Sequence, residues 1–174
     1  MISVVISDPC MVKAEALLRS ISSDLEADTP QSREIEIEAG PEVSRRLEAL
    51  GDLPFGAAVI TPGGQLSVDF LIHVVLQSPE DVVTPDGLRM ALTNGLRRAE
   101  EWGVTTLAVP PLGTGPGKLD AQEAAAVILP VLSEHLQSAG HLREVLILAG
   151  TEYERDVFAG LLAGLDTPDL DHGF

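Results

Sequence analysis

The strongest constraint on the fold of this chain lies in residues 104–119, where an apolar segment runs directly into a glycine-rich one. The segment reads Val-Thr-Thr-Leu-Ala-Val-Pro-Pro-Leu-Gly-Thr-Gly-Pro-Gly-Lys-Leu. Its first six residues have the composition of a buried strand, and the two prolines stop that strand because proline cannot donate to a sheet ladder. Glycines allow positive φ angles and a close approach of the main chain to a ligand. Such a loop at a strand end can hold a phosphate with its N–H groups.

The residues after this loop decide which groups can bind an anion. Asp120 and Glu123 have the spacing of a helix capping pair, and an alanine-rich helix follows them. A capping carboxylate takes up the helix N–H donors and repels an anion, so the donors must be the amides of residues 113–117. A P-loop needs Ser or Thr after the lysine, but Leu119 follows Lys118. A simple chain-reversing turn stays open as an alternative.

Strand-like and helix-like segments alternate along the rest of the chain. Residues 14–21 fit either a strand or a helical face, and at residues 29–38 a Thr-Pro helix start conflicts with strand-like alternation. The pattern predicts an α/β sandwich with a mixed sheet whose later strands are parallel, and ligands bind at the carboxyl ends of such strands. We expect strands at Ile2–Ile6, 57–61, 70–76, 104–109 and 145–149, the first and the last two of them buried. We expect helices at 43–50, 88–99, 124–136 and 153–162.

Charge and composition exclude several classes of function. The net charge is −16, which argues against binding nucleic acid because that affinity comes largely from basic side chains. A small anionic ligand is therefore favoured. The chain has one cysteine, no apolar run long enough to span a bilayer and no signal-like start, so we expect a cytoplasmic protein that does not bind membranes.

The histidines and the cysteine do not form a metal-binding pattern. The four histidines, at 73, 135, 141 and 172, lack ligand spacing, and we predict no metal and no cofactor. His73 lies within an apolar strand and is interpreted as a hydrogen-bonded core histidine. Cys10 is interpreted as a small apolar residue rather than a catalytic thiol.

Four segments taken together resemble the macrodomain family of ADP-ribose-binding modules. They are Ala-Gly-Pro-Glu-Val at 39–43, Gly-Ala-Ala-Val-Ile-Thr-Pro-Gly-Gly-Gln-Leu at 56–66, Phe-Leu-Ile-His-Val at 70–74 and Leu-Ala-Val-Pro-Pro-Leu-Gly-Thr-Gly at 107–115. The resemblance implies a three-layer α/β/α sandwich around a mixed central sheet, in one domain at 1–165 followed by a loose acidic tail at 166–174. It also implies a helix at 29–39. It assigns the second diphosphate-contacting loop to Gly113, Thr114, Gly115, Pro116 and Gly117.

The first third of the chain departs from the family pattern. Asp8 matches by spacing the aspartate that accepts from the adenine amino group. Where the family has an Asn-Ala-Ala-Asn-like stretch, this chain has Arg-Ser-Ile-Ser at 19–22, and its first glycine-rich loop is replaced by the acidic segment 23–30. Ser22 could still orient a water molecule, and Arg19 and Arg33 could offset the added negative charge by pairing with phosphate.

Two hypotheses for function follow from the resemblance. In the first, the chain binds ADP-ribose or a related nucleotide diphosphate through residues 113–117, either as a free nucleotide or on an ADP-ribosylated protein, without efficient hydrolase activity. No catalytic residue is identified, and any hydrolysis is expected to be slow. In the second, the chain is a degenerate macrodomain that serves as a scaffold or as a subunit of a homo-oligomer.

Overall fold

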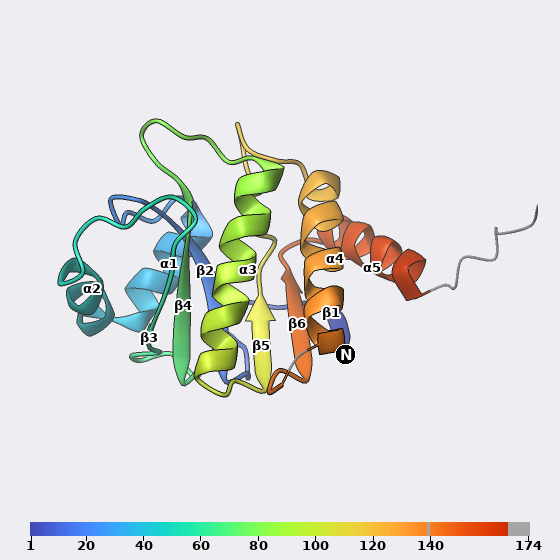
Figure 1. The fold of residues 1–174 in the computed structure, drawn as a ribbon, viewed down its shortest axis with the longest axis horizontal. Coiled ribbons are helices and arrows are strands. Elements are labelled where there is room, and N and C mark those ends of the chain that lie inside the picture. Colours follow the sequence, from blue (N-terminus) through green and yellow to red (C-terminus); the bar gives the residue numbers. More distant parts are fainter. Residues whose placement is uncertain (139, 167–174) are drawn as a thin grey trace, which may run out of the picture.

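The computed structural model shows a six-stranded sheet between two layers of helices (Figure 1) and describes residues 1–138 and 140–166. The predicted tail spans 166–174: Asp166 is the last residue of helix α5, and residues 167–174 lie outside the described residues. No described helix is both long enough and apolar enough to cross a membrane. In chain order the elements are β1 (Ile2–Ile6), the short helix η1 (Pro9–Met11), β2 (Ala16–Ser22), α1 (Pro30–Ala39), α2 (Pro41–Glu48), β3 (Ala58–Pro62), β4 (Phe70–Gln77), α3 (Pro85–Glu101), β5 (Thr106–Val109), α4 (Ala121–Ser138), β6 (Glu144–Ala149) and α5 (Glu152–Asp166).

The strand order is β1-β6-β5-β2-β4-β3, and every neighbouring pair is parallel except β3 with β4. The prediction of a mixed sheet with parallel later strands is therefore confirmed. Helices α3, α4 and α5 cover one face of the sheet, and α1 and α2 cover the other. This is the three-layer α/β/α sandwich that the resemblance implied.

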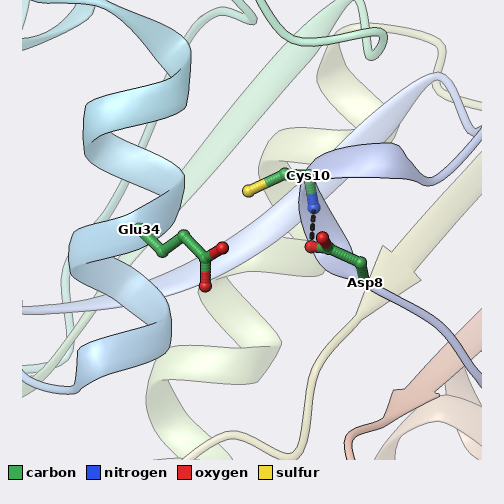
Figure 2. Close-up of side chains that lie close together, drawn as sticks. All are labelled: Asp8, Cys10 and Glu34. Atoms are coloured by element: carbon green, nitrogen blue, oxygen red, sulfur yellow. Dashed lines mark hydrogen bonds between the residues drawn. The ribbon is translucent and has the colours of Figure 1, made fainter.

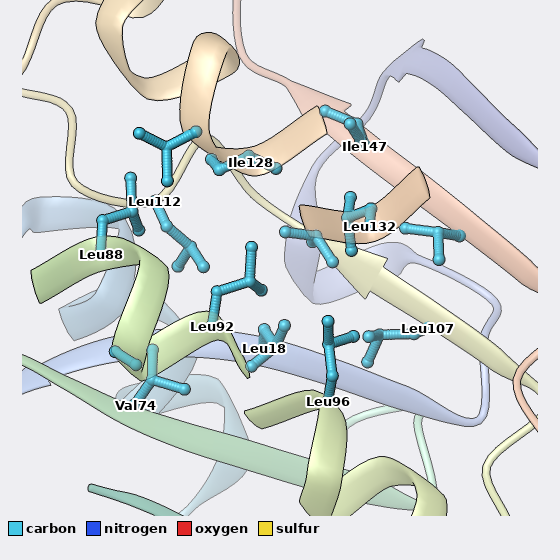
Figure 3. Close-up of a cluster of buried hydrophobic side chains, with 14 of the residues drawn as sticks. Leu18, Val74, Leu88, Leu92, Leu96, Leu107, Leu112, Ile128, Leu132 and Ile147 are labelled. Carbon is cyan, nitrogen blue, oxygen red and sulfur yellow. The ribbon is translucent and has the colours of Figure 1, made fainter. Parts of the chain in front are cut away.

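Each face of the sheet carries its own apolar cluster, because successive strand residues point to opposite faces. Leu18 and Leu107 point toward α3 and α4, where they join a large aliphatic core (Figure 3). Leu17 and Ala108 point the other way and pack with Ile35 of α1 in a smaller cluster. The near absence of aromatic residues leaves both clusters almost entirely aliphatic.

The structure resolves the segments that the sequence left ambiguous. Residues 16–21 belong to the strand β2 (Ala16–Ser22), which is buried along its whole length. The conflict at residues 29–38 is settled in favour of the helix, since Thr29 caps α1 by accepting from the Ser32 N–H at 3.0 Å. The alternation of isoleucines was misleading there: Ile35 is buried, whereas Ile37 is 68% exposed.

The prediction that Ile2–Ile6 is a buried strand is wrong in one respect. β1 lies at the edge of the sheet and pairs only with β6. Its last two residues, Val5 and Ile6, are 37% and 48% exposed. β-branched residues favour strands at an edge as well as in the centre, so composition alone could not distinguish the two positions.

The central strands β2 and β5 separate after a short contact. They pair only at Ala16 with Leu107 and at Leu17 with Ala108. β2 then leads to α1 on one face of the sheet, while β5 leads to α4 on the other. In parallel sheets such a divergence leaves a crevice at the carboxyl ends of the strands.

On the helical face that carries α3 and α4, the Glu100 carboxylate joins three parts of the fold. It accepts hydrogen bonds from the main-chain N–H groups of His141 and Leu142 at 2.9 and 3.1 Å, and it lies 3.0 Å from the His135 ring. Burial raises the pKa of Glu100, but these hydrogen bonds lower it and outweigh burial. Glu100 thus fixes α3 to the end of α4 and to the start of β6.

We predict that Glu100→Gln lowers the free energy of unfolding at pH 7 by about 1–2 kcal/mol, because a charged acceptor of two main-chain N–H groups is lost. A lowered folded-state pKa contributes stability above the unfolded value of about 4.3 and loses it as pH falls through the folded value. The difference between variant and wild type should therefore shrink below about pH 4. Urea unfolding at several pH values measures this. Glu101→Gln, which affects only an exposed pair with Arg98, should change stability by less than about 0.5 kcal/mol. Equal effects of the two substitutions would contradict the assignment.

Candidate functional site

A cavity of about 280 Å³ lies in the crevice between the loops that follow β2 and β5. The β2–α1 side contributes Ser20 and the first residues of α1, and the β5–α4 side contributes the two prolines and the start of the glycine-rich loop. The lining residues are Ser20, Thr29, Pro30, Gln31, Pro110, Pro111, Leu112, Gly113, Thr114 and Glu154. The cavity therefore occupies the place that the topology of the sheet leaves open.

The glycine-rich loop presents unpaired main-chain donors beside this cavity. Gly113 and Gly117 have φ angles of +79° and +74°, and Gly115 has +136°, all in the region that favours glycine. Within the described part of the chain, the N–H groups of Gly113 and Thr114 donate to no protein acceptor. Because both residues line the cavity, their amides are available to an anionic ligand.

The start of α4 is closed to such a ligand, as the sequence predicted. The Glu123 N–H donates to Asp120 Oδ1 at 2.8 Å, and the Asp120 N–H donates to Glu123 Oε1 at 3.3 Å. This reciprocal capping box satisfies the first turn and places two carboxylates there. An anion in the cavity must therefore use the loop amides rather than this helix.

The segment that replaces the family's first glycine-rich loop is tied directly to the second loop. Lys118 Nζ donates to the Asp28 carbonyl at 2.6 Å and lies 3.8 Å from Asp28 Oδ2. The Ser20 hydroxyl donates to Asp28 Oδ1 at 2.6 Å. The Asp28 and Lys118 side chains are only 1% and 14% exposed. This contact bridges the two walls of the cavity on the side of Ser20.

Arg19 is buried beside this contact without a hydrogen-bond partner. It is 1% exposed, and its Nε, Nη1 and Nη2 atoms have no acceptor among the described residues. Burial lowers the pKa of Arg19, while Glu36 and Asp28 act in the opposite direction by favouring the charged form. Arg19 does not line the cavity, so the expectation that it meets phosphate directly is not supported by its position.

His73 lies next to Arg19 on the paired strand β4. It is fully buried, and its Nε2 is 2.9 Å from the Thr61 hydroxyl. Burial, and then the charge of Arg19, lowers the pKa of His73 well below its ordinary value. The interpretation of His73 as a hydrogen-bonded core histidine is confirmed.

The structure brings only part of the predicted site residues to the cavity. Gly113 and Thr114 line it, whereas Gly115, Pro116 and Gly117 lie further along the loop. Ser22 does not line the cavity. Its hydroxyl donates to the Gln77 carbonyl at 3.4 Å, and the register of β2 against β4 shifts between Ile21 and Ser22.

Three polar residues of the wall were not predicted from the sequence. Ser20 precedes the point where β2 leaves the sheet, and no sequence signal distinguishes it from Ser22. Gln31 lies at the start of α1, in the segment whose secondary structure the sequence left ambiguous, so its side could not be assigned. Glu154 comes from α5, which is far away in sequence, and it caps that helix by accepting from the Gly150 N–H at 3.0 Å.

Asp8 lies outside the cavity, beside the first turns of α1 (Figure 2). Its Oδ1 accepts from the Cys10 N–H at 2.9 Å, and the ligand atoms of Asp8, Cys10 and Glu34 lie within 4.8 Å of one another. Burial, followed by the charges of Asp8, Glu34 and Glu38, raises the pKa of the Cys10 thiol to about 11. A protonated thiol is a poor metal ligand. This environment does not favour a metal ion at the three residues, and the expectation that the chain binds no metal stays a prediction.

Comparison with known proteins relates this arrangement to one family. A family model described as Macro domain matches residues 21–128, more than half of the chain. A macro domain-containing protein from Caldanaerobacter subterraneus is 26% identical over 160 residues, which cover 88% of this chain and 91% of that protein.

Solved structures show the same fold. A mutant of the Oceanobacillus iheyensis macrodomain with ADPR aligns with a TM-score of 0.85 at 21% identity, covering 94% of this chain and 92% of that chain. A Trypanosoma brucei macrodomain in complex with ADP aligns with a TM-score of 0.82 at 18% identity, covering 91% of this chain and 68% of that chain.

The environment of Cys10 leads to a prediction about its reactivity. Iodoacetamide at pH 8 should alkylate Cys10 in the folded protein about a hundredfold more slowly than in urea, because raising the thiol pKa from about 8.5 to about 11 depletes the thiolate. Mass spectrometry of timed samples gives both rates. Asp8→Asn, which removes one of the neighbouring charges, should speed alkylation of the folded protein. Equal rates with and without urea would contradict the assigned environment.

Proposed function

The chain belongs to the macrodomain family, and on that premise we propose that it binds a nucleotide diphosphate, ADP-ribose or a close relative, in the cavity between the β2–α1 and β5–α4 loops. The observation that carries the proposal is the pair of unpaired N–H groups on Gly113 and Thr114, which line that cavity. Main-chain donors held by a rigid loop suit phosphate oxygens, because they need no reorganisation on binding.

The charge of the protein sets a condition on this function. The chain carries −16 overall, and among the described residues that line the cavity the only ionisable side chain is that of Glu154. A diphosphate must therefore be attracted by local dipoles, namely the loop amides and the start of α1, where the Gln31 N–H has no protein acceptor within the described residues. Binding is expected to be moderate in strength.

Asp8 is the proposed contact for the base. It is exposed and lies beside Glu34, three residues along α1 from Gln31 on the cavity wall. A carboxylate beside the start of α1 can accept from the exocyclic amino group of adenine while the diphosphate reaches the glycine-rich loop. The same contacts serve a free nucleotide or ADP-ribose attached to a protein.

Calorimetry tests the proposal directly. Titration with ADP-ribose and with ADP at low salt should give saturable heat with a dissociation constant below about 1 mM, equivalent to about 4 kcal/mol. The absence of heat and of a thermal shift for both nucleotides at millimolar concentration would refute it. That result would leave the scaffold hypothesis, which a stable oligomer would then support.

Gly115→Val should weaken nucleotide binding at least tenfold. Gly115 has φ +136°, which a β-branched residue does not adopt, so the loop must rearrange and displace the amides. Gly103→Val is the matched control, because Gly103 also has positive φ and nothing lies within 4 Å of an added Cβ. Gly103 lies in the turn before β5, at the opposite end of that strand from the glycine-rich loop. The control should lose similar stability, about 1–2 kcal/mol, and keep its affinity. Equal loss of affinity in both variants would count against the loop.

Asp8→Ala tests the base contact. The variant should bind ADP several-fold more weakly than the wild type does, whereas binding of inosine diphosphate, which lacks the amino group, should be unchanged. Competition titrations with both nucleotides measure this. A parallel loss for both would show that Asp8 acts through the fold rather than through the base.

A further inference from the structure

Three charged groups near the cavity have no role in the binding just described. Asp28 has a buried carboxylate whose Oδ2 lacks a hydrogen bond among the described residues. Lys118 lies on one side of it with Nζ 3.8 Å from Oδ2, and the buried Arg19 lies close enough for the two charges to interact. Two cations thus share one carboxylate, and neither forms a hydrogen bond with it.

We propose that Lys118 determines ligand specificity: its ammonium group leaves Asp28 for the terminal phosphate of the ligand, so the cleft prefers nucleotides that end in a free phosphate, such as ADP, over ADP-ribose. The inference rests on the proposed function, since it concerns the same cavity. Arg19 is the positioning residue that keeps Asp28 neutralised after Lys118 has moved.

The position of the pair supports a role at the end of the diphosphate. Asp28 directly precedes Thr29 on one wall, and Lys118 follows the glycine-rich loop of the other wall. The pair therefore lies beside the cavity, adjacent in sequence to the wall residue Thr29 and to the glycine-rich loop. The remaining volume of about 280 Å³ is at the lower limit of about 300–1,000 Å³ for small-molecule sites. A small space at this end favours a ligand without a second ribose over ADP-ribose.

The charges give the direction of the preference. A terminal phosphate carries close to two negative charges at pH 7 because its second pKa is near 6. Each phosphate of ADP-ribose forms one ester bond and one anhydride bond, so it carries only one negative charge. The described lining residues include no cation, so Lys118 is the nearest ammonium that could compensate the extra charge. Its four-carbon side chain has the rotamer freedom to turn away from the Asp28 carbonyl, toward the wall that Asp28 adjoins at Thr29.

Arg19 explains why Asp28 can release the lysine. A buried carboxylate that loses its partner is strongly destabilising unless another cation remains. Arg19 remains, because it is fixed on β2 beneath α1 and has three unpaired N–H-bearing nitrogens. The exchange moves one cation while the charge of the buried cluster stays balanced.

The test compares ADP with ADP-ribose by calorimetry in the wild type and in variants of the charged residues. The wild type should bind ADP at least tenfold more tightly than ADP-ribose. Lys118→Met should lose that preference, mainly by weakening ADP, and Lys118→Arg should retain most of it. Lys13→Met removes the same charge from the exposed, opposite end of β2 and should leave the preference unchanged.

Asp28→Asn should change the affinity for ADP in the opposite direction. It keeps an acceptor for the Ser20 hydroxyl but releases Lys118, so ADP should bind several-fold more tightly; Asp69→Asn, at an exposed site, is the control. Equal affinity of the wild type for the two nucleotides, equal weakening of both by Lys118→Met, or weaker ADP binding by Asp28→Asn would each overturn the inference. Failure of the wild type to bind either nucleotide would instead refute the proposed function.

Discussion

The whole arrangement depends on the early separation of β2 from β5. The two central strands share only two residue pairs before their chains turn to opposite faces of the sheet. Main-chain groups beyond that point cannot pair with each other and need other partners. The loops supply some of them, and the rest, including the N–H groups of Gly113 and Thr114, face a cavity. The crevice is thus a consequence of strand connectivity and not of any single side chain.

Charge is the second determinant of this cleft. The protein is strongly acidic, yet its proposed ligands are anions, and the positive field is supplied by main-chain amides and by one buried cluster. In that cluster Asp28 holds together the two segments that follow β2 and β5, through Ser20 on one side and Lys118 on the other. The acidic segment that replaces the first glycine-rich loop is therefore a structural wall of the site. Under the proposed role of Lys118, this segment also sets which anion the site prefers.

Several features could be predicted from local sequence because they depend on neighbouring residues only. The capping pair at Asp120 and Glu123 and the strand that ends at the two prolines both formed as expected. The helix that starts at Thr29 was expected only from the family resemblance, because its cap and its alternation conflict locally. The edge position of β1 could not be predicted, since a β-branched strand looks the same in the centre and at the edge. The wall residues Ser20 and Glu154 were also missed, because β2 and the first turn of α5 line the same cavity only in the folded chain.

The sequence by itself determined the class of fold, the family and the loop that offers donors to an anion. The class of fold and the donor loop follow from periodicity, capping residues and glycine, whose effects act within a few residues, whereas the family follows from the resemblance of four segments taken together. Only the tertiary structure decided that Lys118 is held by Asp28, that Arg19 is buried without a hydrogen-bond partner among the described residues, and that the cavity between the β2–α1 and β5–α4 loops is small. Those facts depend on contacts between segments about ninety residues apart, and no local pattern encodes which charges meet when the two loops close on each other.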